Sequence, residues 1–319
     1  MENKLPTRRN ARSRPRSFKL KKYIPIYIMG LPGLLYLFIN NYMPLPGLVL
    51  AFKNYNAKAG IYGSPWAGLA NFKYLFSNDV WYITRNTMLY NMAFIVINTV
   101  LAIAIAILLS EMQSKAAMRA RKMYQSMILL PFLLSSVIVS YLVFAFLSTD
   151  NGFFNKTILR MLGQDPISWY SERKYWPFII VFVNAWKGVG YSCVIFLATI
   201  LGFDKSYYEA AVIDGASKMQ QIFYITIPML KNIVVMITLL QIGRIMYSDF
   251  GLFYQVPRNS GALFQVTNTI DTYVYRGLVE LGSIKMSAAA GVYQSLVGFI
   301  LILGTNLLVR KIDPDSALF

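Results

Sequence analysis

Histidine is absent from this 319-residue sequence, and cysteine occurs only once, at Cys193. Without histidine, the chain has no imidazole to serve as a catalytic base, a metal ligand or a pH-sensitive group. A single cysteine cannot form an intrachain disulfide, and its apolar neighbours predict a buried structural thiol. The sequence also lacks any Gly-Lys dipeptide and therefore any Walker A phosphate loop. If the protein uses ATP, another chain must bind the nucleotide.

Charged residues are scarce as well, at 14% of the chain, against roughly 25% in ordinary soluble domains. Hydrophobic residues make up 56%, yet the formal net charge is +17. The basic residues are concentrated, because the first 22 residues hold nine of them against one acid, Glu2. This separation of apolar and basic blocks indicates a polytopic membrane protein with a basic cytoplasmic face.

Six apolar stretches of about 20 residues predict membrane-spanning helices. The first is too long for a signal peptide and no small-residue cleavage site follows it. We therefore predict an all-α membrane protein with a basic tail at 1–22, a transmembrane domain at 23–313 and a short C-terminal segment at 314–319. The predicted spans are 23–43, 87–110, 123–147, 177–201, 229–247 and 286–309.

Basic residues in the short segments predict the orientation, because loops rich in lysine and arginine stay in the cytoplasm. They occur in the N-terminal tail, in the loop after the second span (Lys115 to Lys122) and at the C-terminus (Arg310, Lys311). We therefore expect a plasma-membrane protein with both termini in the cytoplasm. The tail would contact anionic lipid; nucleic acid is excluded because no aromatic residues alternate with its charges.

Three longer segments, 44–86, 148–176 and 248–285, would then face outward. They hold four of the five tryptophans, Trp66, Trp81, Trp169 and Trp176. Tryptophan at such positions usually anchors the headgroup region of the membrane, and we expect that role here. Stacking on a ligand is the alternative.

The loop between the fourth and fifth spans, residues 204–228, contains two capping-box patterns, Ser206 with Glu209 and Ser217 with Gln220. Gly215 lies between them, where a helix would end in a residue with positive φ. The pattern predicts a helix, a tight turn and a second helix. Pro228 would mark a bend leading into the fifth span.

This loop resembles the EAA loop of permease subunits in ATP-binding-cassette importers. Glu209, Ala210 and Ala211 precede Gly215, and the Ile-x-Leu-Pro ending is present at 225–228 with isoleucine in the leucine position. Four further segments resemble maltose-type sugar permeases, including the branch that imports oligosaccharides or polysaccharide fragments: 32–36, 41–54, 186–190 and 309–314. The resemblance implies the type I importer permease fold with a cytoplasmic coupling helix, in the plasma membrane of a bacterial cell.

The resemblance also implies partners and a mechanism. The first helix of the loop would dock on an ATP-binding subunit, with Ala210 and Ala211 allowing close approach and Asp214 preceding the turn at Gly215. Glu209 would cap its own helix, pair with a basic residue of the ATPase, or do both. Two ATP-binding subunits carrying ATP and Mg²⁺, a second and different permease chain and an extracellular substrate-binding lipoprotein would complete the importer. This chain itself would bind no cofactor or metal and catalyse no reaction.

Polar residues inside spans are candidates for the cargo path, because they are costly in lipid. In the fourth span, Asn184, Lys187 and Tyr191 share one helical face, with Trp186 beside them. In the fifth span, Gln241 and Arg244 are three residues apart. All six could contact a sugar; packing against neighbouring helices is the alternative. Gly188 and Gly190 predict close helix approach.

Two other functional classes are less consistent with the sequence. An ion-coupled secondary transporter would usually carry carboxylates within its spans, and the six predicted spans contain none. A membrane enzyme would need an acid, base or metal cluster, which the sequence does not provide. The leading hypothesis is a permease of an ATP-driven carbohydrate importer; the same transporter class with a non-sugar cargo remains an alternative.

Overall fold

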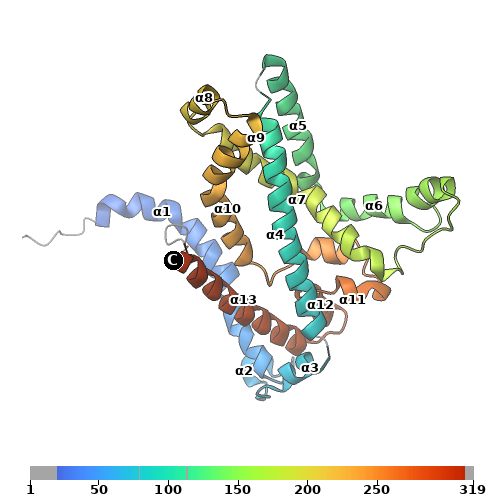
Figure 1. Ribbon diagram of the computed structural model, residues 1–319. Coiled ribbons are helices and arrows are strands. Elements are labelled where there is room, and N and C mark those ends of the chain that lie inside the picture. Colours follow the sequence, from blue (N-terminus) through green and yellow to red (C-terminus); the bar gives the residue numbers. More distant parts are fainter. Residues whose placement is uncertain (1–19, 79, 113, 313–319) are drawn as a thin grey trace, which may run out of the picture. The chain divides into compact units, whose positions relative to one another are not determined.

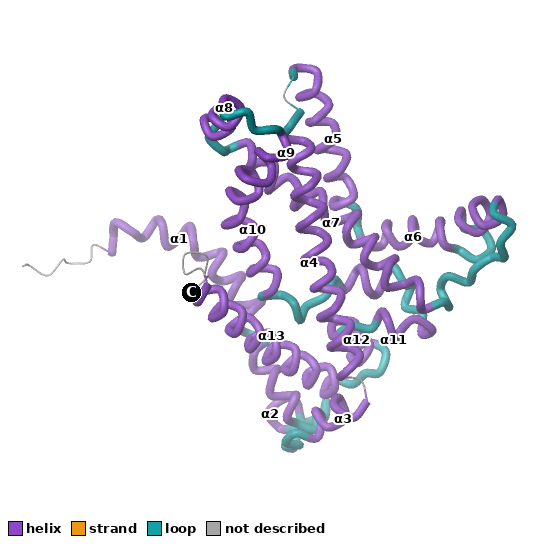
Figure 2. Tube along the Cα trace, in the orientation of Figure 1, coloured by secondary structure: helices purple, strands orange, loops and turns teal. Residues whose placement is uncertain are grey.

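The computed structural model describes residues 20–78, 80–112 and 114–312. These residues form helices and loops without a sheet; an isolated bridge pairs Lys53 with Trp66 (Figure 2). The chain divides into two parts, Met1–Gly47 and Leu48–Phe319. Most of the predicted basic tail and the C-terminal segment 314–319 lie outside the described residues.

The first part contains the predicted first span. Helix α1 covers Leu20–Leu37 and continues into a π-helical turn at Phe38–Tyr42. Pro25 and Pro32 lie inside α1. Each proline removes one backbone hydrogen bond, which membrane helices tolerate better than an isolated helix does.

The second part contains four long helical runs that are apolar enough to cross a membrane. The predicted second span starts earlier than expected, because α4 begins at Val80 and includes Arg85. The predicted fifth span ends earlier, at Ile242, and a turn follows. The four runs are α4 (Val80–Ser110), α7 (Trp176–Leu201), α9 to α10 (Lys218–Ile242) and α13 (Ile284–Ile312).

The predicted third span is not one continuous helix. It consists of α5 (Lys115–Leu133) and α6 (Ser136–Leu147), which meet at an angle of 98°. Leu134 and Ser135 between them are extended, and Ser135 Oγ accepts the backbone N–H of Ile138 at 3.3 Å as the N-cap of α6. Pro131, near the end of α5, weakens the last turn before the break.

Helix α7 is the centre of the second part and packs along both α4 and α5 (Figure 1). Small residues Ala102, Ala106 and Ala185 lie in the buried core between α4 and α7. A Cβ atom on Gly190 would lie 2.0 Å from the carbonyl oxygen of Ile128 in α5, so only glycine fits this crossing. The predicted close approach is confirmed at Gly190. The thiol of Cys193 is buried in the same core, as predicted.

The segment 248–285 was expected to be a loop but is mostly helical. It contains two short helical turns, Gly251–Gln255 and Gly261–Leu263, then α11 (Phe264–Thr267) and α12 (Ile270–Val279). Arg276 is buried there, donates to Asn259 and Asn268, and lies 3.9 Å from the centre of the Phe264 ring. Burial lowers the pKa of Arg276 from its ordinary value.

Two of the four predicted membrane-anchoring tryptophans belong instead to a protein core. Trp176 is fully buried, and its indole N–H donates to the carbonyl of Trp169 at 2.7 Å. Trp169 in turn donates to Asn155 Oδ1 at 2.9 Å. Trp66 and Trp81 remain exposed, at 68% and 76%. The anchoring role predicted for all four therefore does not apply to Trp169 and Trp176.

Candidate functional site

The first helix of the 204–228 loop is α8, Ser206–Ile213, and different hydrogen-bonding patterns fix its two ends. At its start, Asp204 Oδ1 accepts the backbone N–H of Ser206 at 2.9 Å, which lowers the pKa of Asp204. The predicted Ser206–Glu209 capping box is wrong: Ser206 is already the first helical residue, and the preceding residue makes no side-chain cap. Asp204 accepts the backbone N–H of Ser206, which the Glu209 side chain would accept in a capping box.

The turn after α8 is as predicted. Gly215 has φ of +81°, and the N–H of Ala216 donates to the carbonyl of Ala211 at 2.8 Å. The N–H of Gly215 donates to Val212 at 3.1 Å, which completes a Schellman motif. Ser217 and Gln220 then form a capping box at the start of α9, Lys218–Gln221. This helix–turn–helix was predictable because every signal is local.

Helix α8 buries none of its eight residues. Glu209 and Ala210 are exposed, and Ala211 is half-buried. Val212 and Ile213 have exposed fractions of 60% and 86%. A helix of this length has little stability of its own, and apolar side chains exposed outside a membrane span are typical of a protein–protein contact.

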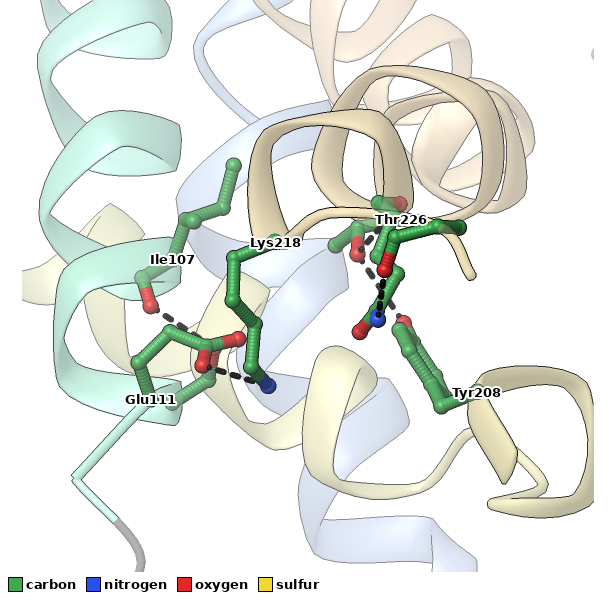
Figure 3. A network of polar contacts seen from close by, with 8 residues as sticks. Ile107, Glu111, Tyr208, Lys218 and Thr226 are labelled. Atoms are coloured by element: carbon green, nitrogen blue, oxygen red, sulfur yellow. Dashed lines mark hydrogen bonds and ion pairs between the residues drawn. The ribbon is translucent and has the colours of Figure 1, made fainter. Parts of the chain in front are cut away.

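Two side-chain contacts hold the loop to the long helices (Figure 3). The hydroxyl of Tyr208 lies 3.0 Å from Thr226 Oγ1, and Thr226 donates in turn to the carbonyl of Gln221. Either hydroxyl group can be the donor in the bond between Tyr208 and Thr226. Lys218 Nζ lies 3.0 Å from Glu111 Oε2, beyond the end of α4. The loop is thus linked to two different spans.

Thr226 belongs to a π-helical turn, Ile222–Thr226, that precedes α10, Ile227–Ile242. Pro228 occupies the first turn of α10, where its missing N–H is tolerated. The proline does not interrupt the helical run, which continues from Lys218 to Ile242. The expected bend at Pro228 is therefore replaced by a wider helical turn just before it. Such turns often occur at functional sites.

A groove of about 950 Å³ lies behind α8. Its walls come from α8, α9, the ends of α4 and α7 and the N-terminal part of α5. Charges of both signs line it, with Glu111 and Glu209 facing Arg121, Lys205 and Lys218. Because α8 buries no residue, it can shift relative to the spans without breaking a hydrophobic core.

The predicted polar face of the fourth span lies against its neighbours. Asn184 Oδ1 accepts from Asn98 Nδ2 in α4 at 2.9 Å. Lys187 Nζ donates to Ser136 Oγ at 3.1 Å, at the start of α6. The ring of Tyr191 stacks on Phe132 with centroids 4.9 Å apart. This face therefore connects α7 to α4 and to the break between α5 and α6.

The exposure of these residues differs along the face. Asn184 and Lys187 are half-buried, whereas Tyr191 has an exposed fraction of 51%. Trp186, on the neighbouring face, has an exposed fraction of 37%. The contacts of Asn184 and Lys187 are those expected from helix packing. The rings of Trp186 and Tyr191 are only partly covered by the described chain.

The two candidates in the fifth span differ in burial, although the backbone N–H of Arg244 donates to the carbonyl of Gln241 at 3.0 Å. Gln241 lies half-buried in the last turn of α10, whereas Arg244 follows the helix in a turn and is exposed. No ion pair joins Arg244 to Asp249 within the described chain. Asn91 from α4 donates to the carbonyls of Ile245 and Tyr247 at 2.8 and 3.0 Å, which supports this turn.

Comparison with known proteins identifies the chain. Residues 102–314 match the family described as binding-protein-dependent transport system inner membrane component. The chain belongs to this family. It is therefore a multi-pass inner membrane permease of an ATP-binding-cassette transporter, a pore-forming and non-catalytic subunit.

Similar proteins cover nearly all of the chain. Protein LplB of Bacillus subtilis is 32% identical over 93% of this chain and 92% of its own length. The polygalacturonan/rhamnogalacturonan transport system permease protein YteP of the same organism is 32% identical over 93% and 90%. A crystal structure of a bacterial importer of the acidic polysaccharide alginate matches with a TM-score of 0.82 and 27% identity, over 92% of this chain and 98% of that one. The type I permease fold predicted from the sequence is confirmed.

The sequence did not predict the contacts that fix α8. Tyr208 directly precedes the Glu-Ala-Ala segment, but its partner lies 18 residues further on, in a turn whose π-helical geometry has no simple sequence signal. Glu111 follows the end of α4 and Lys218 begins α9, so their pairing depends on how distant elements pack. In the sequence, only the opposite charges of Glu111 and Lys218 indicated that the two residues could pair.

Proposed function

We propose that this chain is one of two permease subunits of an importer that moves an oligosaccharide into the cell, with α8 as the helix that docks on an ATP-binding subunit. The observation that carries the proposal is an eight-residue helix with no buried residue, whose apolar side chains Val212 and Ile213 have exposed fractions of 60% and 86%. Glu209, Ala210, Ala211, Asp214 and Gly215 form the docking segment.

The cargo class follows from the relatives. Those most similar to this chain include permeases named for polygalacturonan or rhamnogalacturonan and for arabinooligosaccharides, and the matching solved importer carries alginate. These are all polymeric or oligomeric saccharides. A chain that matches them over about nine tenths of its length is best explained as a permease for a saccharide of several units.

Charge supports the orientation. The basic start of α5 and the α8–α9 hairpin lie at the same end of the second part (Figure 1), and basic loops stay in the cytoplasm. We therefore place this end and both chain termini in the cytoplasm, with the basic N-terminal tail at anionic lipid. The segments 44–86, 148–176 and 248–285 then face outward.

The remaining components are assigned by chemistry. This chain has no Walker A loop, so two partner subunits bind ATP and Mg²⁺. A second, different permease chain completes the pore. The matching alginate importer was solved with a substrate-bound periplasmic protein, and we propose that an extracellular binding lipoprotein delivers cargo here.

The structure suggests how motion passes from the ATPase to the spans. When the ATP-binding subunits close, α8 moves with them. Tyr208 transmits the displacement to Thr226 and so to α10, whose first turn contains Pro228, while Lys218 transmits it to the end of α4 through Glu111. Because α4 and α10 are separate spans, moving both changes which side of the pore is open.

We propose that cargo passes the surface formed by Trp186, Lys187 and Tyr191 beside the broken span, with Asn184 positioning this surface through α4. Arg244 and Gln241, at the end of α10, extend the same set of candidates. A cation next to exposed aromatic rings suits saccharides, since rings stack on sugar faces and the ammonium group binds hydroxyl or carboxylate oxygens.

Gly215→Pro tests the docking role. Proline fixes φ near −65°, which is incompatible with the +81° of Gly215, so α8 and α9 cannot keep their turn. We expect saccharide uptake to be abolished while the chain still inserts in the membrane. Gly163→Pro is the matched control, because Gly163 also has positive φ (+65°) in open space but lies in the 148–176 segment.

The control variant should retain uptake. Normal uptake by Gly215→Pro would overturn the docking role. If no ATPase subunit copurifies with the wild-type chain in mild detergent and uptake follows an ion gradient instead, the protein is a secondary transporter and the proposed function is wrong.

A further inference from the structure

A second pocket, of about 720 Å³, lies at the opposite end of the described second part from α8 and has no role in the mechanism above. It forms where the segment 54–71 meets the start of α13, and its volume is within the range of small-ligand sites. Its lining includes Trp66, Asn71 and Lys285.

Trp66 offers a rigid aromatic surface in this pocket. Its ring stacks on Phe52 with centroids 6.1 Å apart and an angle of 12°, and Phe52 packs against Phe72. The indole is nonetheless 68% exposed, so the side away from Phe52 is open. An aromatic ring covered on one side and open on the other is already placed to stack on a flat apolar ligand surface.

The backbone around Trp66 is held by hydrogen bonds. Ala67 N–H donates to Phe52 at 2.8 Å, and Asn54 N–H donates to Pro65 at 2.9 Å. The Asn71 side chain donates to the carbonyls of Ala51 and Lys53 at 2.9 and 3.0 Å. The pocket floor is therefore ordered before any ligand arrives, which lowers the entropic cost of binding.

The charge of the pocket is positive. Lys285 Nζ donates to Asn54 Oδ1 at 3.0 Å and is the cation among the lining residues, none of which is acidic. Ser283 adds a hydroxyl group beside it. A ligand that fits this set has a flat apolar face, hydroxyl groups and a negative charge.

We propose that the pocket formed by Trp66, Asn54 and Lys285 is an external binding site for an acidic saccharide, with a uronate ring stacked on Trp66 and its carboxylate on Lys285. The inference rests on the proposed function, because the orientation given there places the pocket outside the membrane. It adds a location where the permease itself contacts saccharide before the cargo enters the pore. An anionic lipid headgroup shares the charge but lacks the flat pyranose face.

The test uses the complete transporter in phosphatidylcholine nanodiscs, without the binding protein. Saturation-transfer NMR measures binding of trigalacturonate and of galactotriose, a neutral saccharide of the same length. We expect the acidic trimer to bind more tightly, with an affinity that weakens as salt increases.

Three variants locate the site. Trp66→Ala should weaken binding of both trimers about tenfold, because the stacking surface is lost. Lys285→Met should leave the neutral trimer unaffected and lower affinity for the acidic one about fivefold, the usual scale of an exposed ion pair. Trp81→Ala is the matched control, since Trp81 is similarly exposed but does not line the pocket.

The outcomes separate this inference from the proposed function. If wild type imports saccharide but binds no trimer, or if Trp66→Ala binds like wild type, the site does not exist although the importer does. If anionic lipid in the nanodiscs abolishes trimer binding, the pocket is a headgroup site and the inference is overturned. Loss of ATP-driven uptake in wild type would instead contradict the proposed function.

Discussion

The hydrogen bond between Tyr208 and Thr226 joins the exposed helix α8 to the turn that leads into α10. Tyr208→Phe removes only the hydroxyl group and keeps the ring. Thr226→Val removes the partner hydroxyl while keeping the branched shape of the side chain. If this bond transmits motion, either variant should weaken the coupling between ATP hydrolysis and uptake without disturbing the fold.

The structure sets the size of the effect. A neutral hydrogen bond contributes about 1 kcal/mol net, and leaving a buried partner unsatisfied costs more. Thr226 is buried, at 4% exposed, but it keeps its donation to the Gln221 carbonyl at 3.5 Å when Tyr208 loses its hydroxyl. We therefore expect a loss of about 1 kcal/mol, or about fivefold in the equilibrium between coupled and uncoupled positions of α8.

The assay compares the transporter in proteoliposomes, measuring both ATP hydrolysed and saccharide taken up in the presence of loaded binding protein. Each single variant should consume about fivefold more ATP per saccharide. The double variant should be no worse than Thr226→Val alone, since that change already removes the bond to Tyr208. Tyr207→Phe is the control, because Tyr207 is exposed and next to Tyr208 but makes no contact with Thr226.

Two results would refute this reasoning. Effects of Tyr208→Phe and Thr226→Val that add in the double variant would mean that the residues act separately. An unchanged ratio of ATP to saccharide in all three variants would mean that motion reaches α10 by another route.

Three further predictions concern other contacts. Glu111→Lys or Lys218→Glu alone should lower binding-protein-stimulated ATP hydrolysis up to about fivefold, and the double charge exchange should restore it; no recovery would argue against the ion pair. Gly190→Ala should destabilise the purified chain by about 1–3 kcal/mol in thermal unfolding, because its Cβ meets a backbone carbonyl of α5, whereas Gly291→Ala, in open space, should not. Lys187→Met should lower uptake of an acidic saccharide more than uptake of a neutral one. If the variant takes up both saccharides as the wild type does, Lys187 is not part of the cargo path.

Much of the fold could be predicted because lipid imposes a strong constraint on sequence. A membrane helix must satisfy its own backbone and present apolar side chains, so long apolar runs indicate spans directly. The break in the third span was not predicted, because hydropathy averaged over a window of about 20 residues does not show two extended residues such as Leu134 and Ser135. Pro131 followed by two adjacent serines was the local signal for it.

The candidate site was predictable where its determinants are local. Gly215 and the Ser217–Gln220 box specify the turn within a few residues. The contacts of Tyr208 with Thr226 and of Glu111 with Lys218 depend on tertiary packing. The spacing of these residues along the chain therefore does not predict that they meet.

Short outer elements were also missed. Helix α12 is ten residues long and mixes apolar with polar side chains. Its position depends on contacts with distant helices: Thr87 Oγ1 of α4 accepts the N–H of Ile270, and Gln294 of α13 donates to Asp271 Oδ1. Neither length nor hydropathy indicates such a helix when it is read alone.

Crosslinking from α8 tests the central claim most directly. The chain has one cysteine, buried Cys193, so a Cys193→Ser background allows a single reactive thiol to be placed at Ile213, which is 86% exposed. Met161→Cys is the control, because Met161 is 82% exposed but lies in the 148–176 segment. A thiol-linked photocrosslinker at position 213, but not at 161, should join the chain to an ATP-binding subunit. Equal crosslinking from both positions, or none from position 213 in an active transporter, would contradict the account.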